Sequence, residues 1–382
     1  MRPLRIFFSI ACLLILASNV WSISRWNESR GVYDDICYLR QAHLFQRFGW
    51  HGLDTSLSRD DDRYLAGKLR DINFPSWSDT TTAPCHTRTA DGTKWVLTPP
   101  PGTGFFLSLF PEGLQVVPLY MLANVIVAAF ALTGLWLARR PGPLGIAAVF
   151  GMMTIYFMIN PTKMSYSMAP TMVSCALAGL LTAKLFADER PSRIALTAAL
   201  GLVLGLSASF RLPNALLSAG YFLFFALSFL TWRRWDKFLP GLSFGLGFVV
   251  GVLPLLAANA INAGTPFSTT YGGVDAVPPS FDMDVLRLYL GDTQFPLIVA
   301  ACVWAAILWR FARQPGAKRL VLVVAGNLAL NLAFFASHPV FTQYYTIPIA
   351  MLSLWSLLFA SLMQPAEVVD DIALGQAAKA RS

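Results

Sequence analysis

The chain alternates long apolar runs with shorter polar segments, and the length of the runs is typical of membrane-spanning helices. Most runs approach the roughly 20 residues that an α-helix needs to cross a bilayer. Apart from Lys184 and Arg310 near run ends, the runs contain no charged side chain. The ten runs cover residues 6–23, 114–138, 142–160, 165–187, 194–210, 212–231, 238–260, 294–310, 320–337 and 340–363. We therefore predict an all-α polytopic membrane protein with about ten transmembrane helices.

Two polar stretches are longer than the other joins and predict a cap on the outer side of the membrane. They span residues 24–113 and 261–293. Apolar residues recur about three apart over 36–48, a pattern that favours an amphipathic helix lying in the membrane surface. A second short amphipathic pattern covers 64–72. We expect one membrane domain over 1–382, with an outer cap of amphipathic helices and loops.

Composition supports the membrane assignment and excludes other classes of protein. The 382 residues are 55% hydrophobic and only 13% charged, about half the charged fraction of a soluble chain. The net charge of +8 could suggest a nucleic-acid partner, but its distribution follows the topology. With the N-terminus inside, the inner pieces hold 16 Lys and Arg against six acids, and the outer pieces hold 13 against 15. This distribution fits the positive-inside rule, so we predict no nucleic-acid partner.

The first run has two interpretations. Arg2 and Arg5 precede a short apolar stretch, and Val20-Trp21-Ser22 is a weak cleavage site, so a signal peptide is one of them. We favour a retained helix, because Trp21 and Trp26 suit the aromatic belt at a membrane interface. In both cases the chain from about residue 30 lies outside.

Cysteines and acidic clusters give little sign of a cofactor. Cys37 and Cys85 both fall in the outer segment, where an oxidising exterior permits a disulfide, but the sequence does not show that they approach each other. Asp60-Asp61-Asp62 could hold a divalent cation through oxygen ligands, although such a cluster more often starts a helix. No zinc spacing and no phosphate-binding GxxxxGK[ST] loop occurs. We predict no metal and no cofactor.

Asp34 and Asp35 are the candidate catalytic residues. Aspartate favours helix N-caps and the positive end of the helix dipole, so capping is one interpretation. The other is a carboxylate at the bilayer surface that takes a proton from an acceptor hydroxyl. The two roles are compatible for neighbouring aspartates.

Lys163, Arg211 and His338 stand at the outer ends of three predicted helices. Basic side chains at helix ends often snorkel towards the headgroups. They can also hold a lipid phosphate or diphosphate through charge-assisted hydrogen bonds. Arg211 is the strongest candidate for phosphate binding, because the bend at Pro213 fixes its position.

Four motifs resemble the GT-C superfamily of polytopic glycosyltransferases. Tyr33-Asp34-Asp35 follows the first helix, where the family places its essential carboxylate. TPPPG (Thr98 to Gly102) looks like the family's recurrent PPG lead into the next membrane helix. GLSASFRLPN (Gly205 to Asn214) is similar to a glycine-rich helix that ends in Arg before Pro. NAINAGTPFSTTYGG (Asn259 to Gly273) resembles a loop of many bacterial members.

The resemblance implies a glycosyltransferase that takes its sugar from a polyprenyl-phosphate-linked donor at the outer face. Asp34 or Asp35 would act as general base on a lipid, glycan or protein acceptor. Arg211, with Lys163, would hold the donor phosphate, and His338, Tyr271 and Tyr344 complete the predicted substrate-binding set. The expected location is a bacterial cytoplasmic membrane, with membrane lipids around the helices and the site facing the periplasm.

Two rival functions remain at this stage. One is a transporter or flippase for a lipid-linked substrate, but ion-coupled transporters place ionisable groups within the membrane, and no acid lies inside any run. The other is a non-catalytic membrane subunit that carries lipid-linked sugars. The discriminating observation is whether Asp34 and Asp35 are needed for sugar transfer.

Overall fold

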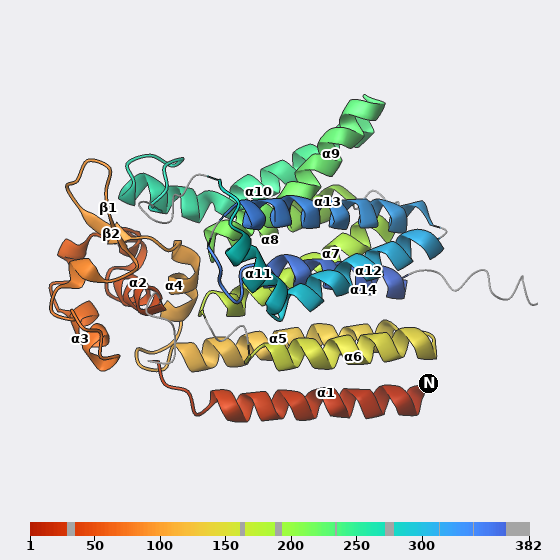
Figure 1. The fold of residues 1–382 in the computed structure, drawn as a ribbon, viewed down its shortest axis with the longest axis horizontal. Coiled ribbons are helices and arrows are strands. Elements are labelled where there is room, and N and C mark those ends of the chain that lie inside the picture. Colours follow the sequence, from red (N-terminus) through yellow and green to blue (C-terminus); the bar gives the residue numbers. More distant parts are fainter. Residues whose placement is uncertain are drawn as a thin grey trace, which may run out of the picture.

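The computed structural model describes residues 1–28, 35–160, 165–187, 193–233, 235–271, 279–312, 314–338 and 340–363. These residues form an elongated bundle of helices with a cap at one end (Figure 1). The all-α prediction is confirmed, because the only sheet in the described residues is one short two-stranded ribbon.

Each of the ten apolar runs forms helix. The bundle helices are α1 (Arg2–Ile23), α5 (Val116–Leu137), α6 (Pro141–Phe157), α7 (Met168–Ala187), α8 (Arg193–Ala208), α9 (Ala219–Trp232), α10 (Trp235–Asn262), α12 (Gln294–Phe311), α13 (Pro315–Ser337) and α14 (Ile347–Met363). A 3₁₀ segment, Leu212–Ser218, leads into α9 after the predicted break at Pro213. Within the described residues, seven helical segments are long and apolar enough to cross a membrane, and α6, α8 and α14 are shorter apolar helices. The helices are thus compatible with an integral membrane protein, and the number of spans stays a prediction.

Close helix contacts in the bundle depend on small residues. Gly201 and Gly205 of α8 face Gly247 and Gly251 of α10, and a Cβ on Gly247 would lie 2.2 Å from the Ala198 carbonyl oxygen. Spacing of four residues places both glycines of each pair on one helix face, which is how membrane helices approach closely. Helix α14 is buried along its length and contacts α7, α12 and α13.

The cap lies at one end of the bundle (Figure 1). It contains α2 (Asp35–Phe48), α3 (Tyr64–Asp71), α4 (Pro101–Ser108), three short 3₁₀ turns (Gly49–Leu53, Leu57–Arg59 and Thr80–Thr82) and strands β1 (His86–Arg88) and β2 (Trp95–Leu97). A further helix, α11 (Met283–Gly291), belongs to the second outer loop and precedes α12. The predicted amphipathic helices over 36–48 and 64–72 are α2 and α3.

Two features of the cap differ from the prediction. The cap contains an antiparallel hairpin, which pairs His86 with Leu97, in place of loop alone. Its turn contains Asp91-Gly92, with Gly92 at φ +71°, a dipeptide that favours hairpin turns. The Pro-Pro-Gly segment leads into the short cap helix α4, and the bundle helix α5 begins only at Val116.

A disulfide joins α2 to the hairpin. Cys37 and Cys85 are bonded and their Cα atoms are 6.2 Å apart, within the range that a disulfide spans. The sequence left this pairing open, and the structure provides it.

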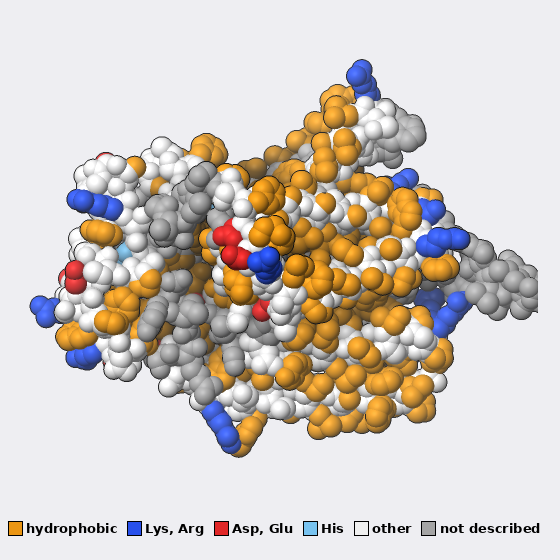
Figure 2. Space-filling model, viewed as in Figure 1, with side chains coloured by type: hydrophobic (Ala, Val, Ile, Leu, Met, Phe, Trp, Pro, Cys, Tyr) orange, Lys and Arg blue, Asp and Glu red, His pale blue; other side chains and the backbone are white. Residues whose placement is uncertain are grey.

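The two ends of the molecule differ in the charge of their exposed side chains. Lys and Arg side chains gather at the bundle end opposite the cap, whereas the cap surface carries both signs (Figure 2). Arg5, near the start of α1, donates a hydrogen bond to the Ala138 carbonyl just after α5, so both chain segments lie at this basic end. Such an arrangement agrees with the positive-inside pattern of the sequence.

Candidate functional site

The second, third and fourth sequence motifs meet at the junction of cap and bundle, and Asp35 of the first motif begins the helix α2 that packs beside them. The Gly102 amide donates to the Ser209 carbonyl (2.7 Å), and the Thr103 hydroxyl donates to the Phe210 carbonyl (3.3 Å). The Pro-Pro-Gly segment therefore lies directly against the residues that precede Arg211. Gly104 contacts Gln41 of α2 so closely that a Cβ would lie 2.7 Å from its side chain. The second and third motifs thus form one packed unit with α2, the helix that begins at Asp35 of the first motif.

The fourth motif closes the same unit from α10. Asn262, at the end of that helix, accepts hydrogen bonds from the Thr55 amide (2.9 Å) and hydroxyl (3.0 Å), and donates to the Leu53 carbonyl (2.8 Å). The Thr270 hydroxyl donates to the Thr98 carbonyl (2.8 Å), next to the three prolines. Segments more than 150 residues apart in the chain are held together here by short polar contacts.

Asp35 is the first residue of α2, and its side chain is fully buried. Its Oδ1 accepts hydrogen bonds from the Ser165 hydroxyl and from the Tyr166 amide, both at 3.1 Å. The Ser165 hydroxyl also contacts the Ser167 hydroxyl at 2.8 Å. The carboxylate thus fixes the chain that leads into α7. Capping was one predicted role, and the donor bound here belongs to the segment before α7.

Two of the predicted residues, Asp34 and Lys163, lie outside the described residues. Asp34 directly precedes Asp35, and Lys163 lies two positions before Ser165; both Asp35 and Ser165 are described. The described residues next to these positions are in contact, because the Asp35 carboxylate accepts a hydrogen bond from the Tyr166 amide.

Arg211 is buried, with 7% of its surface exposed, at the N-cap of the 3₁₀ segment before α9. Its guanidinium lies over the rings of Tyr344 (4.6 Å to the centroid) and Tyr345 (5.3 Å). Its Nη1 donates to the Met168 sulfur at 3.1 Å. Among the described residues no carboxylate forms an ion pair with Arg211, although a buried arginine ordinarily has a negatively charged partner.

Tyr38 shows that the predicted residues share one electrostatic environment. Burial raises the pKa of the Tyr38 hydroxyl well above its usual range, and the neighbouring Tyr271 and Asp35 raise it further. The positive charge of Arg211 and a hydrogen bond with the Ser167 side chain act in the opposite direction on this pKa. Asp35, Arg211 and Tyr271 therefore all act on the pKa of one buried hydroxyl.

The predicted substrate-binding set is partly brought together. Tyr344 lies against Arg211, and Tyr271 belongs to the environment of Tyr38. His338 is at the end of α13, where its ring stacks on Phe334 at 4.3 Å, and its Nδ1 is buried without a hydrogen-bond partner among the described residues. No contact joins His338 to Arg211 in the described part of the chain.

Sequence reasoning missed four side chains at this site: Tyr38, Ser165, Ser167 and Tyr345. Tyr38 falls on the buried face of α2, one turn after Asp35, so helix periodicity could have found it. Ser165 and Ser167 follow Lys163 closely in the sequence, and Tyr345 adjoins Tyr344. Ser165, Ser167 and Tyr345 carried no signal that separates them from ordinary packing residues.

The carboxylates of Asp60, Asp61 and Asp62 all bond to other groups of the protein. Asp60 and Asp62 accept hydrogen bonds from the amides at the start of α3, at Leu65 and Tyr64, which is the helix-starting interpretation. Asp61 pairs with Arg47, which lowers the pKa of that carboxyl. In the described residues, the one group with metal-ligand proximity is Cys37, Cys85 and His86, and its two sulfurs already form the disulfide.

Comparisons with protein-family models, with curated proteins and with solved structures give no match to this chain. The geometry of the site therefore carries the chemical interpretation. A buried guanidinium that is bounded by tyrosines, with hydroxyls and a carboxylate nearby, is suited to bind a phosphate and to handle a proton.

Proposed function

We propose that the chain is a membrane glycosyltransferase of the GT-C type. It would move a sugar from a polyprenyl-phosphate-linked donor to a lipid, glycan or protein acceptor at the outer face of the membrane. The fold in this proposal has about ten transmembrane helices, and the cap faces the periplasm of a bacterial cytoplasmic membrane. No metal and no cofactor enter the proposed reaction.

The observation that carries the proposal is the buried guanidinium of Arg211. It has no carboxylate partner among the described residues, and it belongs to the third motif, which bonds to the second through Ser209 and Gly102. A charge in that position is costly unless an anion compensates it. A phosphate that departs with the lipid provides such an anion, and its negative charge grows as the bond to the sugar breaks. Arginine can stabilise that charge through two parallel hydrogen bonds.

We assign different roles to the two aspartates. Asp35 is fully buried and accepts two hydrogen bonds from the start of the α7 segment, so it is the positioning residue. Asp34 is the general base, which takes the acceptor's proton as the new glycosidic bond forms at the sugar. The polyprenyl phosphate leaves with the electron pair of the broken bond, and Arg211 with Lys163 neutralises it.

A transfer assay tests these assignments. The purified protein in nanodiscs is offered a panel of polyprenyl-phosphate sugars, and donor binding is measured separately. We expect Asp34→Asn to bind donor normally and to lose transfer. Asp284→Asn is the matched control, because Asp284 lies on α11 with its side chain 85% exposed.

Arg211 is tested in the same assay. Arg211→Gln removes the charge and should lower transfer by roughly 10²–10³-fold, the loss typical for one donor to a developing negative charge. Arg287→Gln, with a 73% exposed side chain on α11, removes the same charge from the same end and should have little effect.

Two results would count against the proposal. If Asp34→Asn and Arg211→Gln transfer sugar as well as wild type, neither residue acts in a transferase. If wild type binds donor and transfers nothing with any acceptor, while donor crosses the bilayer of a vesicle, the transport alternative is correct.

A further inference from the structure

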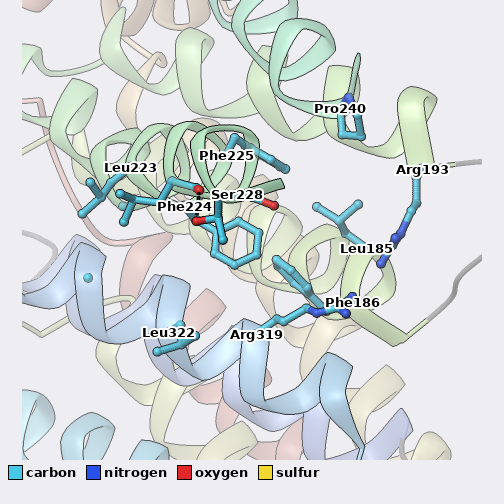
Figure 3. Close-up of a pocket in the computed structure, with 14 residues that line it drawn as sticks. Leu185, Phe186, Arg193, Leu223, Phe224, Phe225, Ser228, Pro240, Arg319 and Leu322 are labelled. Carbon is cyan, nitrogen blue, oxygen red and sulfur yellow. Dashed lines mark hydrogen bonds between the residues drawn. The ribbon is translucent and has the colours of Figure 1, made fainter. Parts of the chain in front are cut away.

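A large cavity in the described part of the bundle extends from the start of α9 to the basic end and does not include Arg211 in its lining. It has a volume of about 680 Å³ and is lined by residues of α7, α8, α9, α10 and α13 (Figure 3). Most of its lining is apolar, including Leu185, Phe186, Leu223, Phe224 and Leu322. Its size falls within the range of protein ligand sites.

The cavity is a wedge between α9 and α13. The two helices touch where α9 begins: a Cβ on Gly220 would lie 2.5 Å from Asn327, whose Oδ1 accepts a hydrogen bond from the Gly220 amide at 3.0 Å. From that contact α9 rises away from the bundle (Figure 1). Gly326 on α13 faces open space, since a Cβ at this position would meet no described atom within 4 Å. The wedge therefore opens towards the basic end.

Two arginines line the open end of the wedge. Arg193, at the start of α8, and Arg319, in the first turns of α13, reach from two sides towards Phe186 (Figure 3). The cavity lining, as far as the described residues form it, contains no acidic residue. Neither arginine forms an ion pair in the described part of the chain, and the Arg193 Nε is buried without a hydrogen-bond partner there.

We propose that this wedge binds an anionic phospholipid, with one acyl chain between α9 and α13 and the phosphate between Arg193 and Arg319. The apolar walls match a hydrocarbon chain, and the two positive charges match a phosphate at the level of the headgroups. The inner leaflet supplies such lipids at the basic end of the molecule. The site stands apart from the proposed donor site, so its success or failure does not depend on that function.

Native mass spectrometry of the purified full-length chain tests the site. Detergent-solubilised protein is titrated with phosphatidylglycerol or with phosphatidylcholine of the same acyl chains. We expect wild type to bind phosphatidylglycerol at least tenfold better than phosphatidylcholine. The double variant Arg193→Gln/Arg319→Gln should lose about thirtyfold in affinity for phosphatidylglycerol, from the attraction of two basic residues to an anionic lipid.

Two matched controls separate the site from general effects. Arg310→Gln/Lys318→Gln removes two charges from the same end, at exposed side chains outside the cavity lining, and should bind like wild type. Gly326→Leu fills the wedge and should weaken both lipids. Gly145→Leu adds the same side chain on α6, where a Cβ also meets nothing within 4 Å, and should leave binding unchanged.

Three outcomes would overturn the proposal. Equal affinity for the two lipids in wild type removes the charge argument. If Arg193→Gln/Arg319→Gln and Arg310→Gln/Lys318→Gln lose affinity for phosphatidylglycerol equally, the lipid is attracted by the overall charge of this end and not by a specific site. If a Leu223→Cys variant forms a disulfide-linked dimer that persists when phosphatidylglycerol is added, a second copy of the chain occupies the wedge.

Discussion

Substitution of Asp35 separates a positioning carboxylate from a catalytic one. The Asp35 Oδ1 accepts the Ser165 hydroxyl and the Tyr166 amide. In Asp35→Asn the side-chain oxygen can still accept both bonds, but each loses its charge-assisted part, which is worth about 1 kcal/mol. We expect the free energy of unfolding to fall by about 2 kcal/mol and sugar transfer to fall less than tenfold.

Asp35→Ala removes the acceptor and leaves the Tyr166 amide buried without its partner, while the Ser165 hydroxyl keeps its contact with Ser167. The stranded amide costs about 1–3 kcal/mol and the lost bond from Ser165 to a charged group about 1.5–3 kcal/mol, so the free energy of unfolding should fall by roughly 2.5–6 kcal/mol and transfer should fall with it. The order of stability is therefore wild type, then Asn, then Ala, whereas Asp34→Asn should keep wild-type stability and lose transfer.

A thiol-reactive dye provides the stability measurement, because Cys12 and Cys175 are buried and react only on unfolding. The exposed Cys302 is first replaced by serine to remove the background signal. If Asp35→Asn is as stable as wild type and inactive, Asp35 is the base, and the positioning argument is refuted.

Three more predictions follow from the cap. Gly102→Ala places a Cβ 2.6 Å from the Ser209 carbonyl oxygen. This variant should lose about 1–3 kcal/mol of stability and most of its sugar-transfer activity. The control Gly67→Ala, in open space on α3, should be neutral or slightly stabilising in the same thiol assay. The Cys37–Cys85 bond closes a loop of sequence separation 48, so its reduction should lower the free energy of unfolding, measured with denaturant, by about 4 kcal/mol. A Cys37→Ser/Cys85→Ser variant should show the same loss of stability and no response to reductant. Burial and the nearby Arg40 lower the pKa of His86 to about 3; the unfolded chain takes up this proton near pH 6.5, so stability should fall as the pH drops from about 6.5 towards 3. His86→Gln should lack that component when tryptophan fluorescence follows unfolding at pH 7 and pH 5, and an unchanged pH dependence would contradict the assignment.

The helices of the bundle were predictable because lipid imposes one strong constraint on them. Each backbone amide and carbonyl within a bilayer must bond inside its own helix, so a long apolar run has one stable conformation. Each of the ten predicted runs forms helix, as this constraint requires of a chain in a bilayer. The cap follows weaker rules, and the hairpin at His86–Leu97 was missed although Asp91-Gly92 is a known turn signal.

The candidate site was only partly predictable. Arg211 could be selected because Pro213 follows it, and that proline breaks the helix at a definite position. Its two tyrosine partners come from the segment before α14, more than 130 residues later, and no local pattern links them. The same is true of the contact between Asp35 and Tyr166. These contacts depend on how distant segments pack together, and no pattern of neighbouring residues in the sequence predicts them.

The contact between Thr55 and Asn262 also sets an order for the making of the protein. These residues are 207 positions apart, and synthesis at about 5–20 residues per second separates their emergence by roughly 10–40 s. In the predicted topology the first outer segment crosses the membrane during that interval, before α10 has been synthesised. Cys37 and Cys85 are both present from early in it, and disulfides can form within seconds. The disulfide can therefore hold the newly made cap in its folded conformation until α10, with Asn262, has been synthesised and binds to it.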